Sequence, residues 1–433
     1  MKKHDGFRDF LGFVLQTSEK KTNYEKLNLK FNPFPKSGTA NINDSDDLIL
    51  ELDPPSEVLN KIGQYINDAM NTNEKNGSDK FLASTIIGDY GSGKTQLLLF
   101  VKALLKTIAS NNILVGKKPY VIYIDNPGTT IMELISSIIL KIGEEDLKKF
   151  IWAKIIKKID GDDLFKQSLT PFLTEINFNG VDPFDNKNTV SYKQFIDAFS
   201  SKITNPREKN NFFITMKSIL LPILKLHSDD EVLAQFFYEF LSTDYGVNKT
   251  WDALRSGTVK QFNGKEVFII RYIIDILKEQ GYTDFFILVD EFEDITKGRL
   301  TKDKIDNYLS NLRTLLDKHR EWCLLFAMTG EALRRLEIIS PPLANRITTI
   351  KINLEALDEK RACEIIKKYL ELARIKDVEN FSPFEVGGIK KILNISNGIN
   401  RLFLKNCYRL IEEASRTGQS IDDHFVEYIS REN

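Results

Sequence analysis

A glycine-rich stretch constrains the fold of this chain more than any other feature of the sequence. Residues 88–95 read Gly-Asp-Tyr-Gly-Ser-Gly-Lys-Thr and match the pattern GxxxxGK[ST] at every fixed position. A short apolar run, Phe81–Ile87, precedes the stretch, and a helical pattern follows it from Thr95 to about Ala109. We therefore predict a buried strand, a tight loop and a helix, as in parallel α/β sheets.

The residue types in this loop predict that it binds a nucleotide. Glycines let backbone N–H groups face phosphate oxygens, and the N-terminus of the following helix adds partial positive charge. Lys94 would place a cation against the β- and γ-phosphates, and the Thr95 hydroxyl is a hard oxygen ligand for Mg²⁺. The predicted nucleotide-binding residues of the loop are Gly88, Asp89, Tyr90, Gly91, Ser92, Gly93, Lys94, Thr95 and Gln96.

A second motif supplies the acidic groups that hydrolysis of ATP requires. Residues 285–291 read Phe-Phe-Ile-Leu-Val-Asp-Glu, an apolar strand that ends in two carboxylates. Asp290 would hold Mg²⁺ through its water shell, and Glu291 would act as general base toward the attacking water. Taken alone, the pattern fits a buried strand with an acidic exit turn equally well. The glycine-rich loop favours the catalytic interpretation and predicts an ATPase.

Three later polar residues are candidates for sensing or stabilising the γ-phosphate. Thr329 follows an apolar strand and would either position the lytic water or cap the next helix. Arg346 follows a proline-bounded turn and would either reach a neighbouring subunit or form a surface salt bridge. Arg401 begins a helix, where a cation is unfavourable unless an anion is nearby, so it is predicted to approach phosphate.

The pattern of apolar runs predicts an α/β core with a large helical insertion. Residues 126–284 separate two strands, which is far more than one crossover helix needs. We predict an N-terminal arm over residues 1–31, a core over 32–353 with a helical insertion at about 143–280, and a helical lid over 354–433. The predicted strands are Phe81–Ile87, Pro119–Asp125, Phe285–Val289, Cys323–Met328 and Ile350–Leu354.

Composition and charge argue against several other classes of protein. The chain has sixty basic and sixty-one acidic residues, so its net charge does not indicate a strongly basic nucleic-acid binder. Three cysteines without a CxxC pair fit a reducing cytoplasm, and no apolar run is long enough to span a bilayer. The most basic stretch of the insertion is either a solvated helix face or a DNA contact. Its residues are Lys148, Lys149, Lys154, Lys157 and Lys158.

The order of these motifs resembles that of the AAA+ ATPases. The loop, the Asp290-Glu291 strand end, Thr329, Arg346 and Arg401 resemble Walker A, Walker B, sensor 1, the arginine finger and sensor 2 of that superfamily, although many relatives carry Asn at the position of Thr329. Asn32-Pro-Phe-Pro is similar to a turn found before the core of helicase loaders and transposition regulators. That likeness implies that Phe34 either contacts adenine or anchors the core.

Within the superfamily, the chain is most similar to the origin-recognition-like branch and to ATP-binding proteins of BREX-type phage defence. The second likeness rests on Trp251-Asp-Ala-Leu-Arg-Ser-Gly and on the acidic strand end. The resemblance implies ATP and Mg²⁺ as cofactors and a homo-oligomer with ATP at subunit interfaces, where Arg346 acts in trans. The insertion would bind a protein partner or DNA.

The function that these features imply is an oligomeric motor or switch in a DNA-related process: phage defence, transposition or replication loading. The alternatives are a protein remodeller and a nucleotide-gated scaffold that hydrolyses ATP slowly. No aromatic-glycine pore loop follows the second strand, which counts against the remodeller. The general-base candidate Glu291 is present, which counts against the scaffold.

Overall fold

A computed structural model describes most of the chain as two compact units. The described residues among Met1–Asn60, Ile87–Ala103 and Asn353–Asn433 form unit 1, and those among Lys61–Ile86 and Leu104–Ile352 form unit 2. Most of the predicted N-terminal arm (1–22) and Phe81 lie outside the described part. The structure describes residues 23–39, 44–70, 82–111, 113–160, 163–164, 167, 191–200, 203–257, 265–295, 301–318, 322–376, 378 and 380–431.

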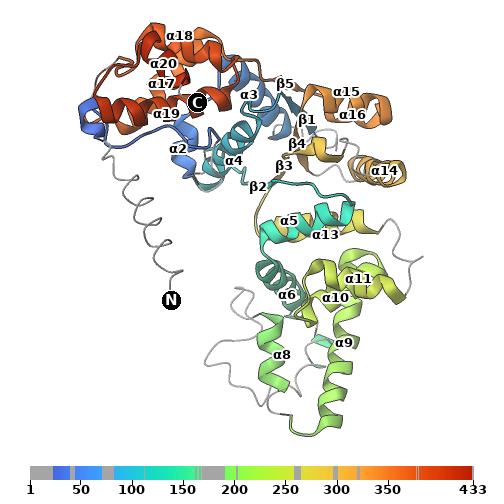
Figure 1. Cartoon of the computed structure of the whole chain (residues 1–433). Helices are drawn as coiled ribbons and strands as arrows, with labels where there is room; N and C mark the ends of the chain where they lie inside the picture. The colour runs from blue at the N-terminus through green and yellow to red at the C-terminus, as the bar shows by residue number, and fades with distance from the viewer. Residues whose placement is uncertain are drawn as a thin grey trace, which may run out of the picture. The chain divides into compact units, whose positions relative to one another are not determined.

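A five-stranded parallel sheet forms the centre of the fold, in the order β2-β3-β4-β1-β5. Strands β3 and β4 are buried throughout and are apolar except for Asp284 at the start of β3, as expected for strands that are covered on both faces. The predicted α/β fold class with its helical insertion and C-terminal helices is confirmed (Figure 1). The strands are β1 (Leu82–Ile87), β2 (Pro119–Ile124), β3 (Asp284–Val289), β4 (Cys323–Met328) and β5 (Lys351–Asn353).

Register places the carboxyl ends of neighbouring strands at one edge of the sheet. Strands β2 and β3 are parallel, with Ile124 opposite Val289, and β3 and β4 are parallel, with Val289 opposite Phe326. The ladder continues one residue beyond β3, because Asp290 N donates to Ile124 O at 2.8 Å. The polar residues that follow β3 and β4 therefore emerge from the same edge.

Helices pack directly on the sheet in unit 2. Helices α5 (Ile131–Ile142) and α13 (Glu266–Glu279) contact each other and lie side by side in Figure 1. Ile138 of α5 and Ile273 of α13 line a small apolar cavity together with Ile122 of β2. A further helix, α3 (Ser56–Met70), contributes Tyr65, whose ring lies edge-on to Phe286 at 6.1 Å.

The insertion between β2 and β3 is a helical bundle with an aromatic core. The Trp152 ring lies 5.0 Å from that of Phe195, Trp251 lies 5.5 Å from Phe236, and all four side chains are buried. Each such ring buries a large apolar area and contributes strongly to the stability of the core. Besides α5 and α13, its helices include α6 (Glu144–Asp160), α8 (Tyr192–Ser200), α9 (Pro206–Ser228), α10 (Glu231–Ser242) and α11 (Val247–Gly257).

The remaining elements of unit 2 lie around β4. Thr85 of β1 ties them to the sheet, because its hydroxyl donates to Ile347 O at 2.6 Å. Packing of α16 against β4 and α14 completes this side of the unit. These elements are η3 (Phe292–Ile295), α14 (Lys302–Lys318), α15 (Gly330–Ile339) and α16 (Pro341–Ile347).

Unit 1 combines the glycine-rich loop with the C-terminal helices. Its core is continuous and includes Phe34 and residues of all four C-terminal helices, which are grouped together in Figure 1. No helix of the described chain is both long and apolar enough to cross a membrane. The elements are η1 (Tyr24–Leu27), α2 (Asp46–Glu51), the start of α4 (Lys94–Asn111), α17 (Glu359–Ala373), α18 (Val386–Ile395), α19 (Asn400–Thr417) and α20 (Asp423–Arg431).

Candidate nucleotide site

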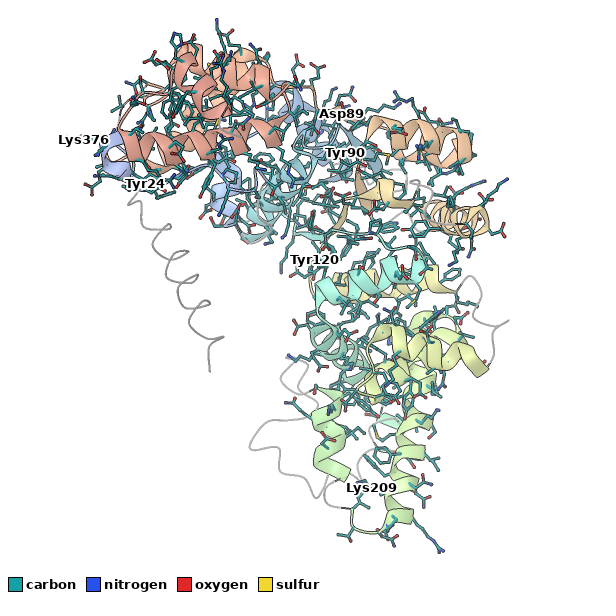
Figure 2. All side chains as sticks on the ribbon, in the orientation of Figure 1. Tyr24, Asp89, Tyr90, Tyr120, Lys209 and Lys376 are labelled. Carbon is teal, nitrogen blue, oxygen red and sulfur yellow. The ribbon has the colours of Figure 1, made fainter. Side chains whose placement is uncertain are left out.

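The predicted loop connects β1 to α4 and has the backbone of a phosphate cradle. Gly91 and Gly93 have φ angles of +78° and +103°, a region that residues with a side chain rarely adopt. The loop is also crowded, because a Cβ on Gly88 would lie 2.4 Å from the Ser92 hydroxyl. Tyr90 is 60% exposed and is labelled in Figure 2. The sequence pattern therefore meets its steric requirement at each glycine.

Lys94 is buried, and its amine points back into the loop. Its Nζ donates to Gly88 O at 3.0 Å and to Asp89 O at 3.2 Å, and it lies 5.5 Å from the centre of the Tyr90 ring. These carbonyl contacts hold the ammonium group within the loop. An incoming phosphate would offer Lys94 a stronger, charge-assisted partner than a neutral carbonyl.

The start of α19 lies against the loop and brings Arg401 to it. Arg401 N donates to Gly91 O at 2.9 Å. A Cβ on Gly91 would lie 2.9 Å from the Arg401 Cβ and 2.9 Å from the Ile399 Cγ2, so only glycine fits there. The Arg401 side chain is exposed beside the loop. The sequence predicted that Arg401 approaches the phosphate site, and the structure brings it to the loop.

A neighbouring residue that sequence reasoning missed also faces the loop. The Asn400 Nδ2 lies 3.3 Å from the position that a Cβ on Gly93 would occupy. Its Oδ1 is buried and accepts no hydrogen bond within the described part of the chain. Asparagine directly before a predicted sensor arginine was the available signal, because a polar residue at a helix start usually has a local partner.

Phe34 lies in the core of unit 1. It is 2% exposed, stacks on Tyr369 with ring centres 5.1 Å apart, and meets Phe384 edge-on at 5.7 Å. Of its two predicted roles, the structure shows the core anchor, whereas a contact with adenine stays a prediction. The side chain of Gln96, the first residue after Lys94-Thr95, forms a hydrogen bond with Tyr369. Phe34 is thus connected through one tyrosine to the helix that begins at the loop.

The predicted catalytic carboxylates follow β3 in unit 2. Asp290 is 4% exposed, and its Oδ1 accepts from Glu291 N at 2.9 Å. Glu291 is exposed and has a φ angle of +52°, which is uncommon for a residue with a side chain. Backbone strain of this kind concentrates at functional sites. The buried carboxylate and the exposed one match the roles of metal holder and general base.

Tyr123 was missed by sequence reasoning, although it contacts Asp290 directly. It is buried in β2, and its hydroxyl donates to Asp290 Oδ2 at 3.0 Å. Burial raises the pKa of Tyr123 well above its ordinary value, and the charge of Asp290 raises it further. The available signal was a tyrosine at the carboxyl end of an otherwise apolar strand.

The structure places Thr329 at the end of β4, where it caps α15. Its Oγ1 accepts from Ala332 N at 3.2 Å, and the residue is 7% exposed. Of the two roles that the sequence left open for Thr329, this is the role of helix cap. A hydroxyl that accepts from the backbone still has a proton to donate, so a second role toward water stays a prediction.

Arg346 is engaged within its own chain. Its guanidinium pairs with Asp317 through two contacts, Nε to Oδ1 at 2.6 Å and NH2 to Oδ2 at 3.2 Å, and NH1 donates to Pro342 O. The side chain is 33% exposed. This is the salt bridge that the sequence offered as its alternative role. A role in trans stays a prediction and requires Arg346 to leave Asp317.

The basic stretch of α6 is mostly occupied by local contacts. Lys148 Nζ lies 3.5 Å from Glu145 and 5.0 Å from the centre of the Phe240 ring. Lys154 is buried and pairs with Glu279 at 3.1 Å. A lysine whose charge is already paired gains less from a phosphate. Lys149 pairs with Asp146 at 3.4 Å, whereas Lys157 and Lys158 are exposed.

The residues present fit a magnesium nucleotide better than a metal held by protein alone. No cluster of three or more His, Cys, Asp or Glu side chains suited to a metal occurs among the described residues. Mg²⁺ in nucleotide sites usually takes one or two protein oxygens and completes its shell with phosphate and water. The Thr95 hydroxyl and the Asp290 carboxylate supply donors of that type.

Comparisons with known proteins give partial matches. No protein-family model matches the chain. A stretch of 89 residues is 37% identical to an uncharacterized HTH-type transcriptional regulator of Methanocaldococcus jannaschii; it covers 20% of this chain and 22% of that protein. The chain thus matches about a fifth of the length of that relative.

Among solved structures, the chain is similar to two origin-recognition proteins of Aeropyrum pernix. The ORC2 protein in its ADPNP-ADP complexes is matched with a TM-score of 0.45 and 15% identity, over 87% of this chain and 67% of that chain. The ORC1 protein in complex with DNA is matched with a TM-score of 0.46 and 12% identity, over 90% and 69%. Similarity at this level fixes neither a ligand nor an activity.

Proposed function

We propose that this protein binds ATP with Mg²⁺ at the loop of residues 88–95 and hydrolyses it, as an AAA+ ATPase of the origin-recognition-like type. In this proposal, Lys94 and Arg401 bind the phosphates, Thr95 and Asp290 hold the metal, and Glu291 activates the attacking water. Mg²⁺, when bound, would neutralise charge on the phosphates.

One observation carries the nucleotide proposal: two helix N-termini and two cations meet at one glycine-rich loop. Helix α4 begins at Lys94, and α19 begins at Asn400 beside Gly91 and Gly93. Neither helix has an acidic residue in its first turn, whereas α5, α6, α10 and α17 all do. No first-turn carboxylate of these two helices neutralises the positive potential at the loop, so this potential favours an anion from outside the chain.

Hydrolysis in addition to binding is supported by the pair of carboxylates at the end of β3. Asp290 is fixed by hydrogen bonds to both of its oxygens, while Glu291 is exposed and able to meet water. A positioned general base contributes about 10²- to 10⁴-fold to a rate. A scaffold that only binds nucleotide would not need that second carboxylate.

For the biological setting, we propose an oligomeric switch in a DNA-related process, such as replication loading, transposition or phage defence. The order of the motifs supports it, as does a partial relative named as a transcriptional regulator. In the oligomer, Arg346 would leave Asp317 to reach the nucleotide of a neighbour. The insertion would bind a protein partner or DNA, and Lys157 and Lys158 are candidate DNA contacts.

The test follows ATP turnover and particle size together, with and without duplex DNA. Wild type is compared with Lys94→Ala, which removes the cation from the loop. The proposal predicts DNA-stimulated turnover and ATP-dependent assembly by light scattering, both lost in the variant. Turnover stimulated only by unfolded polypeptide would support a remodeller, and ATP-dependent assembly without turnover would support a scaffold.

A further inference from the structure

The start of α19 is held against the glycine-rich loop by backbone contacts that lie within unit 1. Arg401 N donates to Gly91 O at 2.9 Å. A turn in which Gly38 N donates to Pro35 O at 2.9 Å also packs on this segment. A Cβ on Gly38 would lie only 2.1 Å from the Arg401 carbonyl oxygen. The main chain of residue 401 therefore sets the distance between α19 and the loop, and the side chain of Asn400 is not needed for it.

The fold leaves the side-chain oxygen of Asn400 without a hydrogen-bond donor among the described residues. Its Oδ1 is buried, and it does not cap α19, whose N-cap Ile399 forms no side-chain cap hydrogen bond. Ser92, the residue before Gly93, likewise has a buried Oγ without a partner in the described part of the chain. Buried polar atoms of this kind destabilise a folded protein, so their occurrence at one loop calls for a role outside the fold.

The position of Asn400 indicates which ligand its amide would meet. Its Nδ2 lies 3.3 Å from the point that a Cβ on Gly93 would occupy, so the amide nitrogen faces the loop. An amide nitrogen carries two N–H donors. In loops of this pattern, backbone N–H groups bind the α- and β-phosphates, whereas the following lysine reaches the β- and γ-phosphates. A donor beside Gly93 is therefore suited to a phosphate oxygen that ADP and ATP share.

We propose that Asn400 binds the nucleotide by donating a hydrogen bond from Nδ2 to a phosphate oxygen that ATP and ADP have in common. The inference rests on the proposed function, because it requires a nucleotide at the loop. It goes beyond that function by giving α19 a second contact, separate from the charge of Arg401, that does not depend on the γ-phosphate. After hydrolysis, α19 therefore still holds the product ADP.

The experiment measures the affinity for ADP and for a non-hydrolysable ATP analogue by calorimetric titration, and the thermal midpoint of the nucleotide-free protein on the same samples. In Asn400→Ala, both affinities should fall about 10-fold, because a hydrogen bond to a charged group is lost. The thermal midpoint without nucleotide should stay the same or rise, because the substitution removes a buried oxygen that lacks a partner. Asn400→Asp should weaken both nucleotides more than Asn400→Ala does, since a negative charge then faces the phosphates.

Asn406→Asp is the matched control, because it adds the same charge to the same helix. The Asn406 Nδ2 donates to Ser396 Oγ at 3.1 Å, so its amide contacts the end of α18. This variant should bind both nucleotides with the wild-type affinity. A loss at Asn400 that is absent at Asn406 therefore reports the local contact and not the net charge of α19.

The outcomes separate this inference from the proposed function. If wild type binds both nucleotides and Asn400→Ala binds them equally well, the inference is wrong and the proposed function stands. A loss for the ATP analogue alone would place the amide at the γ-phosphate and overturn the assignment to a shared phosphate. A lower thermal midpoint of nucleotide-free Asn400→Ala would show a structural role and would also overturn the inference. If wild type binds neither nucleotide, both are overturned.

Discussion

The contact between Gly38 and the start of α19 should make Gly38→Ala strongly destabilising. Gly38 has a φ angle of +69°, and a Cβ on it would lie 2.1 Å from the carbonyl oxygen of Arg401. The left-handed conformation costs a residue with a side chain about 1–2 kcal/mol. Because the obstructing atom belongs to the backbone, overpacking adds about 1–3 kcal/mol. The expected loss in the free energy of unfolding of unit 1 is therefore about 2–5 kcal/mol.

Gly418→Ala is a control on the same helix. Gly418 ends α19 with a φ angle of +76°, but a Cβ there would meet only the Lys26 Cδ at 3.6 Å, an ordinary contact. This variant should carry the conformational cost of about 1–2 kcal/mol alone. The difference between the two variants isolates the collision with Arg401.

Hydrogen–deuterium exchange of the α19 amides is the suitable assay, because it reports the local stability of this helix. Tryptophan fluorescence is unsuitable, since Trp152, Trp251 and Trp322 all belong to unit 2. Gly38→Ala should lower the opening free energy of α19 more than Gly418→Ala does. Equal losses in the two variants, or a smaller loss in Gly38→Ala, would refute the reasoning.

Three further predictions concern the core, the loop and the response to pH. Phe34→Ala should cost about 3–5 kcal/mol in chemical denaturation, since a fully packed ring is lost; a loss under 1 kcal/mol would contradict its role as anchor. Arg401→Ala should weaken ATP binding about 10-fold in equilibrium titrations while leaving the thermal midpoint unchanged, because one charge-assisted contact is lost; unchanged affinity would contradict its place at the phosphates. Burial, and then the charge of Lys154, lower the pKa of His227 from 6.5 to about 4. The unfolded chain therefore binds more protons between those values, so stability should fall as pH decreases through this window and level off below it. The stability of His227→Gln should fall less than that of wild type over this pH range when unfolding is measured as a function of pH. An equal fall in the two proteins would contradict the assignment.

The sequence predicted well those elements whose pattern repeats with a strong period. Strand β4 has the predicted bounds, because its apolar residues form an unbroken run. The helical insertion was predicted to begin at about residue 143, and its helix α6 begins at Glu144. Its first turn is acidic, a signal that depends on the helix dipole and not on apolar spacing.

Helix α14 was not predicted, and α20 was covered only by the general prediction of a helical lid over residues 354–433. Both are short of apolar residues and carry a narrow buried stripe, so their stability comes from the surfaces on which they pack. The same limit applies to the site. Motif spacing located Lys94, Asp290 and Arg401, whereas Tyr123 and Asn400 depend on contacts between segments far apart in the sequence.

The central claim is that Glu291 activates water for hydrolysis of ATP bound at the glycine-rich loop. The most direct test measures phosphate release at saturating Mg-ATP by wild type and Glu291→Gln, with nucleotide affinity determined on the same samples. The account predicts equal affinity and a rate at least about 10²-fold lower in the variant. Equal rates in the two proteins would contradict it.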